Sequence, residues 1–347
     1  MKNISKKAAL LAAVLMIFCI TGCGDNAGGT PTPTPTPAEP QFVARETPLT
    51  LEAIATGEIT LTNPWSTLKY KKNGGDFVSV TASANTIAVA AGDKVEFYAD
   101  GSENTYPTYL KIECSADCYV YGNVMSLLSS TNFKTDVTIP DTMDYAFEEL
   151  FSGNTHIKNH ATKNLVLPAT ELADGCYNSM FEGCTGLTSA PELPGTTLTY
   201  FCYENMFNGC TGLTNAPALP AETLEEWCYA SMFRGCTGLT SAPELPATLT
   251  WDACYDSMFY GCTGLTTAPV LPATNPVAGC YSNMFNGCSS LNSVTCLATD
   301  FFATTCTTDW LDGVAATGTF YKSPDAENTL WDGKIPSGWT VVDYTAQ

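Results

Sequence analysis

The sequence predicts an α/β solenoid of 26-residue units, each with one short helix and one short strand, preceded by a small all-β sandwich domain. The stretch Cys-Tyr-x-x-Met-Phe-x-Gly-Cys occurs five times at a constant spacing of 26 residues, from Cys176 to Cys288. Repetition at such a period is typical of solenoids, whose units bury their apolar faces only by stacking. The region before the repeats instead holds short β-branched runs separated by turn residues.

The chain begins with the features of an exported protein. A lysine-containing start and an apolar run, residues 8–20, precede Thr-Gly-Cys23. Residues 1–22 are therefore expected to be a secretory signal peptide. The cysteine resembles the lipobox of bacterial lipoproteins, which implies a lipidated Cys23 and, with Gly24 after it, location in an outer membrane at the cell surface. The alternatives are an ordinary cleaved signal or a short membrane helix, although the run is too short to span about 30 Å of bilayer.

Residues 23–47 are expected to form the lipidated N-terminus and a linker. A Thr-Pro alternation runs from Thr30 to Pro40 and favours an extended polyproline conformation. At about 3.1 Å per residue, it is expected to act as a stiff spacer that holds the following domains away from the membrane.

Residues 48–118 are expected to form the β-sandwich, with six or seven strands. Turn signals such as Asn73-Gly74-Gly75 separate its apolar runs. The expected strands are 49–55, 58–61, 68–71, 77–81, 86–90 and 94–99. No spacing in this region is that of a catalytic or metal motif, so we expect it to support or cap the solenoid.

Residues 119–316 are expected to form the solenoid, and residues 317–347 a C-terminal cap. In each unit the first Cys, the Tyr, the Met and the Phe stand at offsets zero, one, four and five, which fits one face of a helix. The Gly at offset seven is expected to end that helix. The Ala-Pro-x-Leu-Pro segment that follows predicts a strand of two to four residues, because its proline lacks an N–H. Degenerate copies, 146–154 and 306–314, extend the array.

Sixteen cysteines in an exported chain would ordinarily suggest disulfides. On a helix, however, the two cysteines of one unit would lie about 12 Å apart, too far for a disulfide, so buried thiols are expected. The pairs most open to oxidation are Cys114 with Cys118 and Cys296 with Cys306. With His156 and His160 as the only histidines and no Cys-x-x-Cys, neither a metal nor a cofactor is expected. The second cysteines and their one Asn equivalent are interpreted as a structural ladder: Cys184, Cys210, Cys236, Cys262, Cys288 and Asn154.

The units resemble the BspA-like leucine-rich repeats of bacterial surface proteins. The matching stretches, Met-Phe-x-Gly-Cys-Thr-Gly-Leu-Thr, are residues 180–188, 206–214, 232–240 and 258–266, and residues 334–341 resemble the tail of gut Bacteroidales members. The resemblance covers roughly residues 119–314. It implies a leucine-rich-repeat-like solenoid in which Asn or Cys holds the turn into the strand, and a non-enzymatic surface binder in which adhesion to host proteins or bacteria is the recurrent theme. The Ala-Pro-x-Leu-Pro segments depart from the smoother strand of that class.

The charge balance limits the classes of ligand that the chain is expected to bind. The formal net charge is −20, and Arg234 is the only basic residue between Lys163 and Lys322. This acidity argues against nucleic acid and anionic lipid surfaces as ligands. It leaves two interpretations open: a merely soluble surface, or a surface for a basic or calcium-bridged ligand.

Candidate binding residues are those that vary between units while their neighbours do not. Exposed aromatic side chains with acidic neighbours suit a protein anchor site or a platform on which sugars stack. The alternative is that Phe201 and Trp227 pack inward. The expected surface consists of Tyr200, Trp227, Trp251, Tyr260, Glu225, Glu226, Asp252 and Asp256.

The sequence thus predicts a non-enzymatic, lipid-anchored protein that binds a host or bacterial surface protein. The alternative is a glycan-binding surface lipoprotein for polysaccharide capture. A glycosidase with paired carboxylates ranks last, because no nucleophile motif is present and the acidic residues do not recur at a shared unit position.

Overall fold

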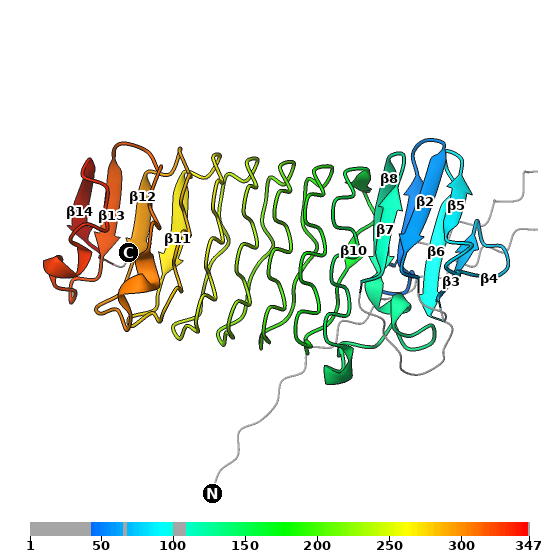
Figure 1. Cartoon of the computed structure of the whole chain (residues 1–347), viewed down its shortest axis with the longest axis horizontal. Coiled ribbons are helices and arrows are strands. Elements are labelled where there is room, and N and C mark those ends of the chain that lie inside the picture. The colour runs from blue at the N-terminus through cyan, green and yellow to red at the C-terminus, as the bar shows by residue number, and fades with distance from the viewer. Residues whose placement is uncertain (1–42, 65–67, 100–108, 346–347) are drawn as a thin grey trace, which may run out of the picture. The chain divides into compact units, whose positions relative to one another are not determined.

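The computed structural model describes residues 43–64, 68–99 and 109–345 (Figure 1). The expected signal peptide, Cys23 and the Thr-Pro run lie outside the described residues.

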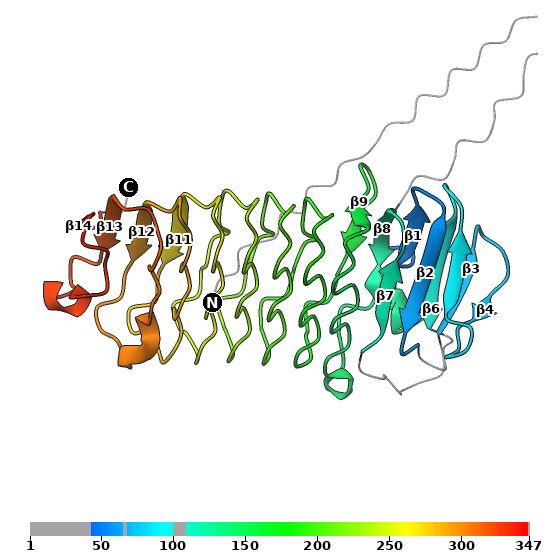
Figure 2. The same ribbon diagram turned by 45° about the horizontal axis from the view of Figure 1, so that its top comes forward.

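The first part of the described chain forms two β-sheets that share one buried cluster of side chains. One sheet has the order β10 (Leu165–Val166)-β8-β1-β6-β3-β4, with β9 (Ile157–Asn159) also pairing with β8, and the other has the order β5-β2-β7 (Figures 1 and 2). Strand β6 shows why the sheets pack: in Lys-Val-Glu-Phe-Tyr-Ala, the alternate residues Val95, Phe97 and Ala99 are buried. The strands are β1 (Thr50–Ala53), β2 (Gly57–Thr62), β3 (Leu68–Lys72), β4 (Val78–Ser79), β5 (Thr86–Val89), β6 (Lys94–Ala99), β7 (Lys111–Cys114) and β8 (Cys118–Asn123). The strands expected from the sequence are therefore present.

The sheet continues into the repeats without a gap. Strands β9 (Ile157–Asn159) and β10 (Leu165–Val166) come from the first degenerate unit, and both pair in parallel with β8. The expected boundary after residue 118 thus falls where β8 has just begun. The described residues belong to one compact unit.

The helix predicted for each unit is wrong: no α-helix occurs among the described residues. The Cys-Tyr-x-x-Met-Phe-x-Gly-Cys segments are runs of overlapping β-turns instead. In the first full unit the N–H of Met180 donates to the carbonyl of Tyr177 at 3.2 Å, and the N–H of Glu182 donates to Ser179 at 3.0 Å. Every fourth residue has a positive φ, such as +53° at Ser179 and +69° at Gly183, as the third residue of a type II turn requires.

The remaining N–H groups of these segments bond to the next unit. Tyr177 donates to the carbonyl of Cys202 at 3.0 Å and Phe181 to that of Met206 at 2.9 Å, and every unit repeats the pattern at two-residue steps. We call each such segment a turn ribbon. Offsets zero, one, four and five fit a four-residue period as well as a helical one, and only the neighbouring unit decides between them. The units stack in register as a repeat solenoid (Figure 1).

On the strand side of the units, the hydrogen-bond ladder between neighbours is interrupted, as the prolines predict. The middle units are joined there only by isolated bridges such as Ser189–Asn215 and Thr197–Thr223. A continuous parallel sheet appears late in the chain, and its register shifts between Thr267 and Val270, around Pro269. Its strands are β11 (Thr267–Leu271), β12 (Ser293–Cys296), β13 (Gly318–Lys322) and β14 (Trp339–Asp343). Four 3₁₀ turns complete the described elements: η1 (Val124–Leu127), η2 (Asp141–Met143), η3 (Thr304–Thr307) and η4 (Asn328–Trp331).

The interior consists of side-chain columns that run from unit to unit. The rings of Tyr177 and Tyr203 stack at 5.7 Å with 2° between their planes, and those of Phe207 and Phe233 at 5.7 Å with 3°. The fourteen cysteines among the described residues are all unpaired and buried, which agrees with the expectation of buried thiols.

Candidate functional site

The residue before the first cysteine of each unit occupies a left-handed backbone position. Its φ is +60° at Gly175, +58° at Phe201, +59° at Trp227, +53° at Ala253 and +64° at Gly279. Glycine adopts this φ without steric cost, whereas an L-residue loses roughly 1–2 kcal/mol. Bulky aromatic residues at a strained position are outliers that call for a functional reason.

The aromatic residues around this position face solvent. Tyr200, Trp227 and Trp251 are 42%, 38% and 48% exposed. Trp227 is therefore not packed inward, whereas Phe201 is half-buried. The core does not require an exposed indole ring on a strained backbone, as at Trp227, because its columns run through other positions.

Three acidic residues adjoin these aromatic residues along the ribbons. The N–H of Trp227 donates to the carbonyl of Asp252 at 3.3 Å, and the N–H of Phe201 donates to that of Glu226 at 3.3 Å. These bonds place Glu226 one unit after Phe201 and Asp252 one unit after Trp227, and Glu225 precedes Glu226 in the chain. Within the described part of the chain, none of the three carboxylates has an ion-pair or hydrogen-bond partner. We call this surface the aromatic patch: Tyr200, Trp227, Trp251, Glu225, Glu226 and Asp252.

Two residues of the expected surface lie elsewhere on the ribbon. Tyr260 is at offset six, at the far end of its ribbon, and the guanidinium of Arg234 lies 4.4 Å from its ring centroid. This cation–π contact covers one face of the ring. Asp256, at offset two, accepts a hydrogen bond from the hydroxyl of Ser257 at 2.6 Å. The structure therefore groups three of the four expected aromatic residues and separates the fourth.

The second cysteines form hydrogen bonds between units. The thiol of Cys236 donates to the carbonyl of Phe207 at 3.1 Å, and Cys184, Cys210, Cys262 and Cys288 make the equivalent bond. Asn154 takes this role in the first unit, where its amide donates to Ile112 of β7 at 3.1 Å. Burial raises the pKa of Cys210 to about 12, so its thiol stays neutral and is a poor nucleophile.

The two histidines do not form a catalytic or metal constellation. His156 lies 3.0 Å from the carboxylate of Asp117, and the ring of His160 packs edge-on against Tyr119 and Tyr121. Burial lowers the pKa of His160. Over the described ranges, no group of three or more His, Cys, Asp or Glu residues is placed to hold a metal ion.

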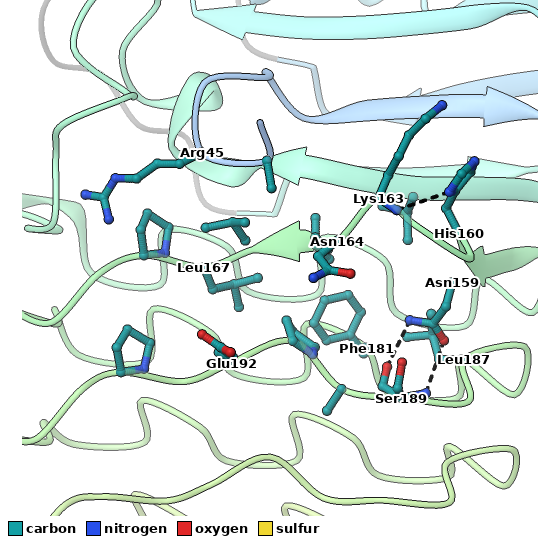
Figure 3. A pocket seen from close by; sticks show the side chains of 18 of the residues that line it. Arg45, Asn159, His160, Lys163, Asn164, Leu167, Phe181, Leu187, Ser189 and Glu192 are labelled. Atoms are coloured by element: carbon teal, nitrogen blue, oxygen red, sulfur yellow. Dashed lines mark hydrogen bonds between the residues drawn. The ribbon is translucent and has the colours of Figure 1, made fainter. Parts of the chain in front are cut away.

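A cavity that sequence reasoning missed lies between the first degenerate unit and the next unit (Figure 3). It has a volume of about 500 Å³, within the range of ligand pockets. Its walls come from residues 44–45, from β8, from residues 137, 159–170 and 181, and from residues 187–194. The sequence contained an indication of this irregularity, because 30 residues separate Ala146 from Cys176, whereas 26 separate the later equivalent residues.

No helix in the described part of the chain is both long and apolar enough to cross a bilayer. Comparison with known proteins found no matching family model, no matching curated protein and no matching solved structure.

Proposed function

We propose that this chain is a non-enzymatic, BspA-like surface lipoprotein. In this proposal, Cys23 anchors it to the outer membrane, and its leucine-rich-repeat-like solenoid presents the aromatic patch to a protein on a host or bacterial surface. The proposed localisation and lipid anchor rest on the sequence alone.

One observation carries the choice of site. The left-handed position is filled by glycine in the first and fifth full units, by Phe201 and Trp227 in the second and third, and by Ala253 in the fourth. The same backbone is thus built in all these units, but the second and third accept strain at an aromatic residue, and the ring of Trp227 is exposed. Tryptophan and tyrosine are the side chains most enriched at binding hot spots. The unpartnered carboxylates beside them suit a partner with basic groups at its rim.

The test separates binding from folding through a matched pair of variants. Trp227→Gly removes the ring and places the preferred residue at a positive φ, so relief of strain offsets part of the lost burial and the variant should still fold. Ala253→Gly makes the same backbone change one unit later without removing a ring. Host mucosal and bacterial surface proteins are fractionated, and the binding of each fraction to the immobilised mature chain is measured.

The expected result is saturable binding that Trp227→Gly and Trp251→Ala lower by at least about tenfold, while Ala253→Gly binds as the wild type does. Equal binding by all four proteins would exclude the aromatic patch as the site.

A glycan ligand is the second candidate, favoured by the unpartnered carboxylates of Glu225 and Asp252 beside exposed indole rings. Such carboxylates can accept hydrogen bonds from sugar hydroxyls while a sugar ring stacks on the indole. A glycan array that is positive for the wild type and negative for Trp227→Gly and Trp251→Ala would favour this candidate over a protein ligand.

A further inference from the structure

The cavity of Figure 3 exists because one unit is longer than the others. The four additional residues of the first degenerate unit fall within the segment 159–164, which packs on the sandwich. Lys163 forms an ion pair with Glu52 at 2.6 Å, and the ring centroid of His160 lies 4.9 Å from that of Tyr119. The neighbouring unit follows its regular path, so a hollow remains between the two.

One end of the hollow is closed by Asn159. Its side-chain oxygen accepts from the N–H groups of Thr188 and Ser189 at 2.8 and 3.1 Å, and its amide donates to the carbonyl of Ser189 at 3.0 Å. Figure 3 shows this contact at the opposite end of the cavity from Arg45 and Glu192. These three bonds hold the two walls at a fixed separation, so the cavity is formed before any ligand arrives.

The walls are apolar, with a few polar groups that retain binding capacity. The apolar part includes Leu165, Leu167 and Pro191. The side chains of Asn164 and Glu192 have no hydrogen-bond or ion-pair partner in the part of the chain that the structure describes. A ligand would therefore meet an amide and a carboxylate that are free to bind it.

Arg45 supplies the opposite charge. Its guanidinium donates to the backbone carbonyls of Lys134, Thr135 and Asp136 at 2.8, 3.3 and 3.4 Å, and no carboxylate among the described residues forms an ion pair with it. Because the group carries five N–H donors, it retains donors for an anion. Arg45 and Glu192 come from different walls and lie on either side of Leu167 in Figure 3.

We propose that this cavity binds a short zwitterionic peptide of apolar residues, an inference that goes beyond the proposed surface binding. The ligand's carboxylate bonds to Arg45, its ammonium group bonds to Glu192 and Asn164, and its side chains contact the leucine and proline wall. A small inorganic anion would leave that wall and Glu192 unused. The cavity offers little for sugar stacking, because Phe181 is fully buried and the ring of His160 already packs against Tyr119 and Tyr121.

Isothermal titration calorimetry of the mature chain with leucyl-leucine tests the proposal. N-acetyl-leucyl-leucine amide, which has the same side chains and no charges, is the probe control. Glu192→Gln is the test variant, and Glu244→Gln is its matched control because it changes the equivalent residue two units later, away from the cavity.

The expected result is saturable binding of leucyl-leucine that weakens by about tenfold or more in Glu192→Gln. The wild type should bind the blocked peptide at least as weakly as Glu192→Gln binds leucyl-leucine. The affinity of Glu244→Gln for leucyl-leucine should match that of the wild type. Three outcomes would overturn the proposal: no heat of binding for leucyl-leucine, equal affinity for the blocked peptide, or equal losses in the two variants. Trp227→Gly should bind leucyl-leucine normally, so the result is independent of the aromatic patch.

Discussion

Replacing Tyr203 by phenylalanine should stabilise the protein. Its ring is 1% exposed and stacks between Tyr177 at 5.7 Å and Tyr229 at 5.8 Å. Its hydroxyl is buried and finds no hydrogen-bond partner among the residues described. A buried polar group without a partner costs roughly 1–3 kcal/mol, and phenylalanine keeps the ring stack while removing that group.

Part of the gain is lost because the departing oxygen leaves a small void. The hydroxyl lies close to Gly195, where an added Cβ would approach it to 3.0 Å. We therefore expect the free energy of unfolding to rise by about 1 kcal/mol, at the lower end of the range for an unpaired group. Tyr229→Phe is the matched control, since its hydroxyl is not among the buried atoms without a partner, and it should give no gain.

Urea unfolding followed by far-ultraviolet circular dichroism measures both variants, with unchanged m-values as the condition for comparing them. A loss of stability of about 1 kcal/mol or more in Tyr203→Phe would refute the reasoning, because it would mean that the hydroxyl is hydrogen-bonded in solution.

The remaining predictions concern the ribbon and its charges. Trp227→Gly should lower the free energy of unfolding by less than the about 3–5 kcal/mol lost when a buried tryptophan is removed, because relief of the positive-φ strain offsets part of the lost burial of a ring that is 38% exposed, and a loss of about 3 kcal/mol or more would contradict this. Asn154→Ala should lower the free energy of unfolding by about 1–3 kcal/mol, because the carbonyl of Ile112 loses the amide donor. A change below about 0.5 kcal/mol would show that this bond is dispensable. Burial raises the pKa of Glu148 from 4.5 to about 7, and the negative charges of Glu149 and Glu204 add to this rise. The folded state therefore holds this proton more tightly than the unfolded state does. Because of this, the free energy of unfolding falls as the pH rises from 4.5 through 7. Glu148→Gln should therefore raise the urea midpoint at pH 8 but not at pH 4, and an equal effect at both values would rule out titration of this carboxyl.

Local patterns were sufficient to predict much of the fold. Alternating burial in runs such as 94–99 depends only on period two, and the 26-residue period requires stacking whatever the local backbone is. The helix could not be excluded in the same way. An isolated Cys-Tyr-x-x-Met-Phe segment satisfies a helical face, and the turn ribbon becomes the better solution only when a neighbouring unit accepts half of its N–H groups.

The candidate site, too, was predictable only in part. Variation between units pointed to Trp227 and Trp251, because exposure follows from freedom to vary. It could not show that Arg234 covers Tyr260, since that contact joins two units through side-chain conformations. The cavity was missed because its walls come from six separate segments, although the longer connection before Cys176 marked where the repeat departs from its period.

The bonds between turn ribbons give the array an electrical direction. The peptide group between Cys202 and Tyr203 accepts through its carbonyl from Tyr177 and donates through its N–H to Cys228. Such peptide groups therefore line up head to tail across the units, as they do along a helix, with carbonyls toward the first unit and N–H groups toward the last. Aligned peptide dipoles favour cations at the carbonyl end and anions at the N–H end. The last ribbon follows this rule with Asp309 and Asp312, whereas the first combines the ammonium group of Lys111 near Gly153 with the unfavourably placed carboxyls of Glu148 and Glu149. Adding or deleting whole units would lengthen or shorten this macrodipole while leaving the charged groups at its two ends in place.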